Sequence, residues 1–164
     1  MSGVAETLWA LRLGEDTLAR ELMAMVERHP AEHEVVHVGR DLARWSQENA
    51  EAVADASGRY GVTGRGERHD VSAGSLRDLS DITAPAGSDE GALLLQGLGH
   101  LHLRASENSL YWEMLAQAAQ ALRDGALLDL ASACHSRSLR QMRWTNTMIK
   151  NLSPQLLTVA AETA

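Results

Sequence analysis

The hydrophobic positions of this chain fall into four long segments in which apolar residues recur at alternating spacings of three and four. This spacing places them along one side of an α-helix, as in the seam between packed helices. The third segment shows it most clearly, at Leu94, Leu98, Leu101, Ala105, Asn108, Trp112, Leu115, Ala119 and Leu122. No stretch alternates apolar and polar residues as a half-buried β-strand does. The sequence therefore predicts an all-α fold, with helices at about 4–28, 31–56, 90–123 and 126–150.

Helix-breaking residues divide these segments into two pairs. His29-Pro30 separates the first pair, and proline suits the first turn of the helix that follows. Asp124-Gly125 separates the second pair as a helix stop and a new N-cap. We expect Ser88 to cap the third helix and the fourth helix to end before Ser153-Pro154. Each pair is then an antiparallel hairpin with a short turn.

Residues 58–88 connect the two hairpins and contain glycines at 58, 61, 64, 66, 74 and 87. A helix of about 26 residues is roughly 39 Å long, and a simple up-down bundle needs only a few residues between helices. A connector of this length therefore predicts a long crossover that sets the second and third helices parallel, within a single domain 1–164. Ser75 and Asp78 have capping-box spacing, so the connector holds either a short helical turn or a disordered loop.

Composition and charge narrow the classes of partner. The chain has 164 residues, a net charge of −7 and a pI near 5.4, which disfavours nucleic acid and anionic membranes because phosphate binding needs clustered positive charge. No apolar run reaches the roughly 20 residues that span a bilayer. The first residues lack a basic and an apolar region, so we expect no signal peptide. Cys134 is the single cysteine, which predicts a reducing, cytoplasmic location.

Several seam positions carry polar residues that helix packing forces inward. Glu15 lies between Leu11 and Leu18, and a buried carboxylate must be hydrogen-bonded, paired or bound to metal. Arg44 or Arg104, about one turn away, is the cation expected to neutralise it. Aligning the helices predicts a buried polar layer made of Glu15, Asn49, Asn108, Ser138 and Gln141. This layer either fixes helix register, as buried Asn does in coiled coils, or is an altered site for a small ligand or a single ion.

Two antiparallel hairpins joined by a long crossover resemble the ferritin-like superfamily over most of the chain. The resemblance implies a di-iron or di-manganese centre, with a Glu from each of two helices and Glu-x-x-His from each of the other two. Glu34-Val35-Val36-His37 has this motif, whereas the fourth helix lacks it. The candidate metal ligands are Glu15, Glu34, His37, Glu107 and His135.

Three functions follow as alternatives. The first, which we expect, is a bundle with a degenerate metal centre, without catalytic residues or a cofactor, that binds a ligand or a protein partner. The second is a di-metal carboxylate enzyme of redox or oxygen chemistry, and the third is iron handling in a larger assembly.

Apolar residues outside the seams predict self-association. Trp9 and Leu13 lie one turn apart on the first helix, Leu103 and Leu110 lie two turns apart on the third, and Trp144 flanks the fourth. Tryptophan is enriched in interface cores. We expect a homodimer that forms through the first or the third helix.

Overall fold

The computed structural model describes residues 2–62 and 89–158, and over these residues the fold is all-α. The elements are α1 (Gly3–Arg28), α2 (His33–Ser57), the 3-10 turn η1 (Gly58–Tyr60), α3 (Glu90–Leu122) and α4 (Gly125–Thr158). The predicted fold class is therefore confirmed. Within the same ranges, no helix combines the length and the apolar character that a bilayer crossing requires.

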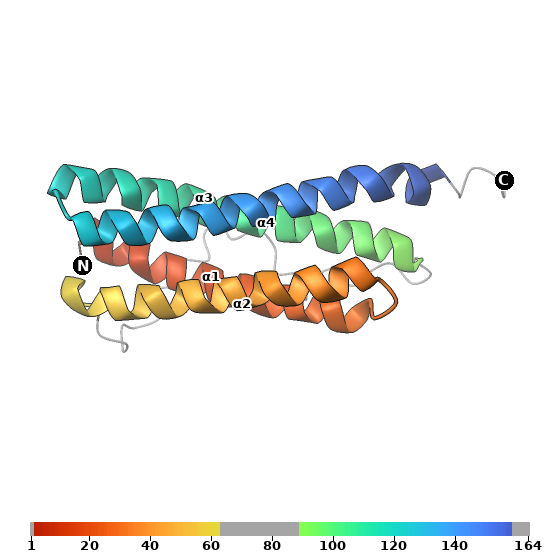
Figure 1. Ribbon diagram of the computed structural model, residues 1–164, viewed down its shortest axis with the longest axis horizontal. Helices are drawn as coiled ribbons and strands as arrows, with labels where there is room; N and C mark the ends of the chain where they lie inside the picture. Colours follow the sequence, from red (N-terminus) through yellow and green to blue (C-terminus); the bar gives the residue numbers. More distant parts are fainter. Residues whose placement is uncertain (1, 63–88, 159–164) are drawn as a thin grey trace.

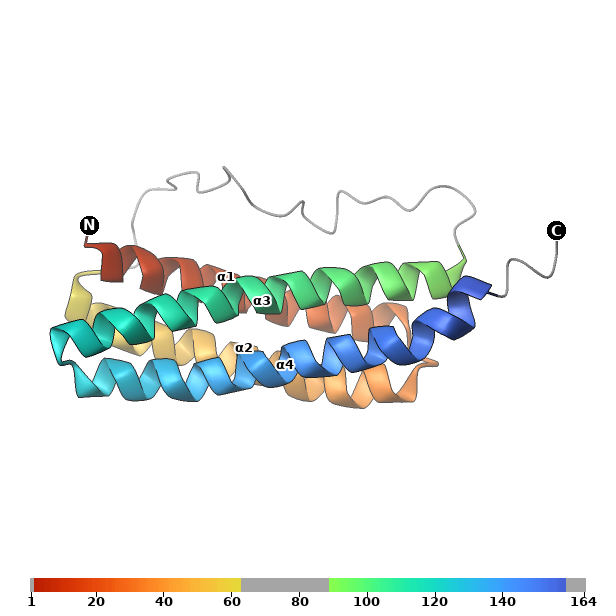
Figure 2. The ribbon, with the colours of Figure 1, turned by 90° about the horizontal axis from the view of Figure 1, so that it is seen from above.

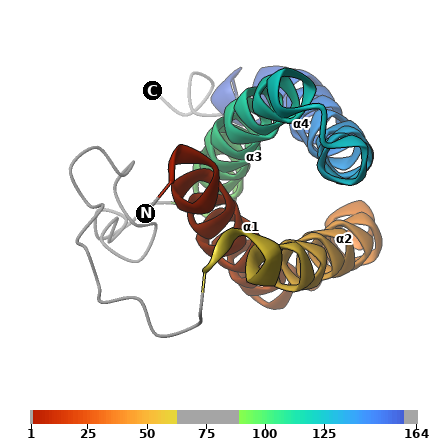
Figure 3. The ribbon, with the colours of Figure 1, turned by 90° about the vertical axis from the view of Figure 1, so that its left-hand side faces the viewer.

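The four helices form a bundle of two antiparallel hairpins (Figures 1 and 2). Helices α2 and α3 run in the same direction, so η1 and the start of α3 lie at opposite ends of the bundle. This is the topology expected from the length of the connector. Seen along its axis, α1 lies beside α3, while α2 packs on α1 and α4 packs on α3 (Figure 3). The helical turn predicted near Ser75 lies outside the described residues.

Carboxylate caps begin the two helices of the second hairpin. The side chain of Asp89 accepts a hydrogen bond from the backbone N–H of Ala92 at 2.6 Å, so Asp89 is the N-cap of α3 and the prediction of Ser88 was wrong by one residue. Asp124 accepts from the backbone N–H three residues later at 2.9 Å, as predicted. The Tyr60 hydroxyl also donates to Asp124, which ties η1 to the turn between α3 and α4.

Helix α4 continues past Pro154 to Thr158, so the prediction that it ends near residue 150 was wrong. Proline has no N–H to donate to the carbonyl four residues earlier, which weakens the helix at this point. Packing offsets that loss, because Leu156 lies against the start of α3. A Cβ on Gly91 would be only 2.7 Å from the Leu156 Cδ2 atom, so glycine is what permits this close approach.

The core consists of two apolar clusters. One lies toward the α1–α2 turn and contains Leu18, Leu22, Met25, Val35, Leu42, Ala43, Leu94, Leu98, Leu101, Ala105 and Met148. The other lies toward the α3–α4 turn and contains Leu8, Leu11, Val53, Trp112, Leu115, Ala116, Ala119, Leu127, Ala131 and Cys134. Along each helix, the buried polar residues described next fall between the two clusters.

Candidate functional site: a buried polar layer

All five residues of the predicted polar layer are buried in the bundle. Their exposed fractions are 0–2% for Glu15, Asn49, Asn108, Ser138 and Gln141. They occupy seam positions on α1, α2, α3 and α4 between residues that belong to the two apolar clusters. The same periodicity that buries the leucines therefore buries these polar side chains.

Glu15 is held by donors from two other helices. Its Oε1 atom accepts a hydrogen bond from the indole Nε1 of Trp112 on α3 at 2.8 Å and another from Asn49 Nδ2 on α2 at 3.3 Å. The Trp112 side chain is fully buried, so its N–H needs this acceptor as much as the carboxylate needs the donor.

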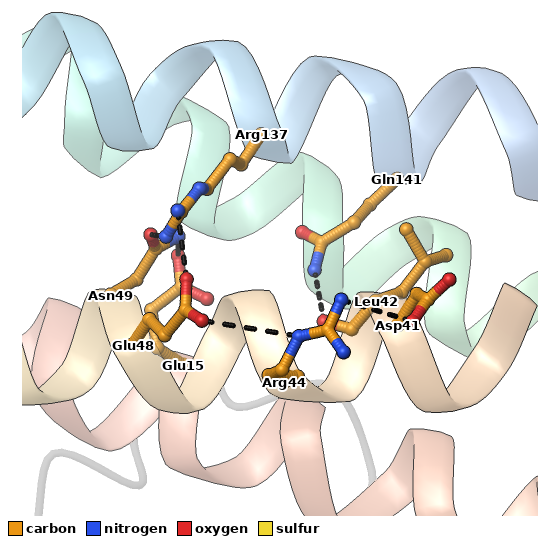
Figure 4. Close-up of polar contacts among 8 residues, drawn as sticks. All are labelled: Glu15, Asp41, Leu42, Arg44, Glu48, Asn49, Arg137 and Gln141. Atoms are coloured by element: carbon orange, nitrogen blue, oxygen red, sulfur yellow. Dashed lines mark hydrogen bonds and ion pairs between the residues drawn. The ribbon is translucent and has the colours of Figure 1, made fainter.

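A chain of polar contacts runs from Glu15 toward the surface between α2 and α4 (Figure 4). Arg137 on α4 donates from NH1 to Asn49 Oδ1 at 3.0 Å and from NH2 to Glu48 at 2.8 Å. Glu48 lies 3.9 Å from the Nε of Arg44. Asn49 thus links the buried carboxylate to a cation at the edge of the bundle.

Gln141 forms the second polar link between α2 and α4. Its Nε2 donates to the backbone carbonyl of Leu42 at 3.1 Å (Figure 4). The same atom also donates to Ser46 Oγ at 2.9 Å. Direct packing between α2 and α4 is sparse compared with that within each hairpin. The two polar links therefore hold this edge of the bundle together.

Asn108 explains the glycine in the middle of α1. A Cβ at Gly14 would lie 2.2 Å from the Oδ1 atom of Asn108, so a side chain at this position would collide with the buried amide. The close approach of α1 and α3 at this level depends on Gly14, although glycine costs about 1 kcal/mol of helix propensity relative to alanine.

Four buried polar atoms of the layer have no hydrogen-bond partner among the described residues. They are Glu15 Oε2, Asn108 Nδ2, Ser138 Oγ and Gln141 Oε1. More than nine in ten buried polar groups in proteins do have a partner, which is another protein group, water or a ligand. The four atoms offer two acceptors, one donor and one hydroxyl that can do either.

Burial dominates the ionisation of Glu15. Desolvation raises the pKa of its carboxyl above the ordinary value, while the hydrogen-bonding side chains of Trp112, Ser46 and Asn49 and the positive charge of Arg137 oppose that rise. Desolvation likewise raises the pKa of the Cys134 thiol to about 12, with a further contribution from Glu15. Cys134 is therefore an unreactive core residue.

The structure does not bring the five candidate metal ligands together. Glu34 and His37 are exposed on α2, and Glu107 lies 3.6 Å from the guanidinium of Arg104. Of the candidates, only Glu15 lies in the layer. Within residues 2–62 and 89–158, no group of three or more His, Cys, Asp or Glu side chains is placed to hold a metal ion. The residues present do not fit a di-metal centre.

His135 takes part in a different contact. Its Nε2 lies 2.9 Å from Ser109 Oγ and its Nδ1 lies 3.6 Å from Glu113. The order hydroxyl, imidazole, carboxylate is that of a hydrolase triad. These residues lie inside helices, however, where backbone N–H groups are used by the helix and none is free to stabilise an oxyanion. The contact ties α3 to α4.

The sequence analysis did not identify Arg137 as the cation near Glu15 or Trp112 as a hydrogen-bond donor to it. The prediction of Arg44 or Arg104 was wrong, because Arg44 pairs with Asp41 at 3.0 Å and Arg104 pairs with Glu21 at 3.3 Å. The cation near Glu15 is Arg137, which precedes seam residue Ser138 and therefore lies at the edge of the seam. Trp112 was placed on the seam by its spacing, but nothing in the sequence indicated that its N–H faces Glu15.

Comparison with known proteins adds no relative: neither a protein-family model, nor a curated protein, nor a solved structure matches this chain.

Proposed function

We propose that this chain is a ferritin-like bundle with a degenerate metal centre, and that its central polar layer binds a small polar ligand. The observation that carries the proposal is the set of four unpartnered buried polar atoms of Glu15, Asn108, Ser138 and Gln141. Each unsatisfied buried group costs about 1–3 kcal/mol. A molecule that hydrogen-bonds to them would recover much of that free energy.

The chemistry of these atoms defines the ligand class. The free oxygens of Glu15 and Gln141 accept hydrogen bonds, and Asn108 Nδ2 donates one. A suitable ligand is small, neutral or cationic, and carries N–H or O–H donors together with an oxygen acceptor. An anion is disfavoured by the Glu15 carboxylate. Water is the competing occupant, because a buried water typically makes about three hydrogen bonds.

Native mass spectrometry of the purified protein tests the proposal. We expect a species heavier than the chain alone, whose extra mass is released on denaturation and identified by chromatography. Ser138→Ala removes one contact of the layer and should lower the retained fraction. Ser136→Ala, an exposed serine on the same helix, is the matched control and should retain it.

Two results would contradict the proposal. If only the chain mass is found and a crystal structure places only water on the four atoms, the layer is a structural register element. If elemental analysis of protein purified without chelators finds stoichiometric iron or manganese, the di-metal alternative replaces the ligand proposal.

We further propose that the chain forms a homodimer and works in a reducing compartment such as the cytoplasm. In support of self-association, Leu13, Leu103 and Leu110 are 48%, 47% and 62% exposed. In support of the location, the chain has one cysteine, which is buried and forms no disulfide.

A further inference from the structure

One row of outward-facing residues on α3 is uncharged along the length of the helix. The residues that recur on it at spacings of three and four, called here the α3 strip, are Ala92, Gln96, Gly99, Leu103, Ser106, Leu110, Met114, Gln117 and Ala121. By contrast, exposed positions of α1 include Glu6, Asp16 and Arg20.

Large apolar side chains are exposed along the α3 strip. Leu103, Leu110 and Met114 are 47%, 62% and 54% exposed. Nothing among the described residues lies within 4 Å of the place where a Cβ on Gly99 would be, so the strip also offers an open notch beside Leu103. Leucine and methionine in line with a glycine notch give this face both knobs and a hole.

Eight of the nine strip residues form four pairs that are symmetric about a point between Ser106 and Glu107, and Ser106 itself lies level with Glu107, which is beside the strip. If a second α3 lies antiparallel across a two-fold axis at that point, Leu103 of each copy faces Leu110 of the other. Gly99 then faces Met114, so the smallest residue meets a long flexible one. The outer pairs are also matched in kind, with Gln96 level with Gln117 and Ala92 level with Ala121. An isologous interface requires self-complementarity of this kind.

The charge distribution of the strip permits a second copy at this face. Two chains of net charge −7 repel each other unless their contact surface is free of unpaired carboxylates. Glu107, which flanks the centre of the strip, is paired within its own chain with Arg104 at 3.6 Å. Glu113, at the edge of the strip, lies 3.6 Å from His135.

We infer that the α3 strip is the homodimer interface, with two copies of α3 packed antiparallel so that Leu103 meets Leu110 and Gly99 receives Met114. The inference deepens the proposed self-association and rests on it, but it is independent of the ligand site. The strip is about 44 Å long and about 10 Å wide, which is small for a stable interface. We therefore expect a dissociation constant in the micromolar range.

Sedimentation of the full chain tests the interface. Between about 0.5 and about 500 µM, the wild-type mass should rise from monomer to dimer. Leu110→Glu places a charge one turn from the centre of the strip and should weaken dimerisation about tenfold or more. Leu139→Glu is the matched control, since Leu139 is a 45% exposed leucine on α4 and its substitution should leave the mass unchanged.

Cysteine cross-linking tests the antiparallel geometry. Leu103→Cys and Leu110→Cys chains should form few disulfide dimers when each is oxidised alone, because equivalent positions are offset by about 10 Å along the helices. A mixture of the two variants should form disulfide heterodimers. Buried Cys134, whose thiol pKa is about 12, does not take part.

The possible failures are distinguishable. If the wild type dimerises and Leu110→Glu dimerises equally well, the α3 geometry is wrong but self-association stands. The same conclusion holds if each single cysteine variant cross-links alone and the mixture does not. A wild-type monomer at every concentration overturns the interface and the self-association together.

Discussion

Glu15 occupies a position that helix packing would give to leucine, and its carboxylate depends on side chains from the three other helices. Trp112 and Asn49 donate to it directly, and Arg137 acts through Asn49. A buried charge in such a place is tolerated only with partners, because desolvation penalises the ionised form. Single substitutions at Glu15 and its neighbours therefore test the layer most directly.

The first prediction concerns the charge of Glu15. Its pKa is raised in the folded state, so below pH 4.5 both states hold the proton and the burial penalty is absent. Above that pH the unfolded state loses its proton before the folded state does. The free energy of unfolding therefore falls as the pH rises through the folded pKa. Glu15→Gln should remove this loss and be as stable as wild type at pH 7, or up to about 2 kcal/mol more stable.

Urea unfolding of wild type and Glu15→Gln between pH 4 and 8 measures this difference. Glu34→Gln, at an exposed position, should show no pH-dependent difference from wild type. A Glu15→Gln variant that becomes less stable than wild type as the pH rises would mean that Arg137 makes the ionised carboxylate favourable.

The second prediction concerns the glycine that faces Asn108. Gly14→Ala gains helix propensity but places a methyl group against the Asn108 Oδ1 atom, and we expect a net loss of about 1–3 kcal/mol. Gly99→Ala is the control, because its methyl group meets open space and should stabilise by about 0.5–1 kcal/mol. Thermal unfolding at a dilution where both variants are monomeric separates them. Equal effects would show that the Asn108 amide moves aside freely.

At the scale of elements, the ends of the helices depend on what they pack against as well as on their own sequence. Pro154 by itself predicts a helix stop, yet α4 continues for four residues because its last turn lies on the start of α3. In the same way, Asp124 caps α4 and also accepts a hydrogen bond from Tyr60 at the end of the first hairpin.

The third prediction concerns this last turn. Leu156→Ala removes the side chain that contacts Gly91, so the turn after Pro154 should open more often and stability should fall by about 1 kcal/mol. Hydrogen exchange of residues 150–158 measures the opening. Leu157→Ala is matched in chemistry, but Leu157 is 68% exposed, and we expect no change. Unchanged exchange in Leu156→Ala would show that the turn is stable without this contact.

At the scale of the whole molecule, the hairpins are joined in two different ways. Helices α1 and α3 pack through apolar residues and Gly14, whereas the α2–α4 edge is held by the polar links of Arg137 and Gln141 (Figures 3 and 4). Removing one partner of a polar link lowers the free energy of unfolding, because the other partner is left without a hydrogen bond. The α2–α4 edge is thus the side on which the bundle is most easily opened.

The fourth prediction tests that edge. Arg137→Gln leaves Asn49 Oδ1 and Glu48 without their donor and should lower stability by about 1–2 kcal/mol. Glu48→Gln should cost less, about 0.5 kcal/mol, because Glu48 is 45% exposed and the pair is screened by solvent. Arg143→Gln, at an exposed position of α4, is the control. If Arg137→Gln costs no more than Arg143→Gln, the link does not hold the hairpins together.

The sequence by itself determined the fold class, the two hairpins and the inward side of each helix. Spacings of three and four residues fix which side chains share a helix face, and this is a local property of the chain. The same reasoning placed Glu15, Asn49, Asn108, Ser138 and Gln141 inside the bundle, because a polar residue within an apolar seam is buried along with its neighbours.

Only the tertiary structure decided which atoms of these residues meet. The choice of Arg137 over Arg44 and Arg104, the contact of Trp112 with Glu15, and the separation of Glu34 and His37 from the layer depend on side-chain reach between different helices. The extension of α4 past Pro154 is of the same kind. Helical periodicity gives the direction of a side chain from its own axis, whereas the distance to a partner is set by how the axes pack.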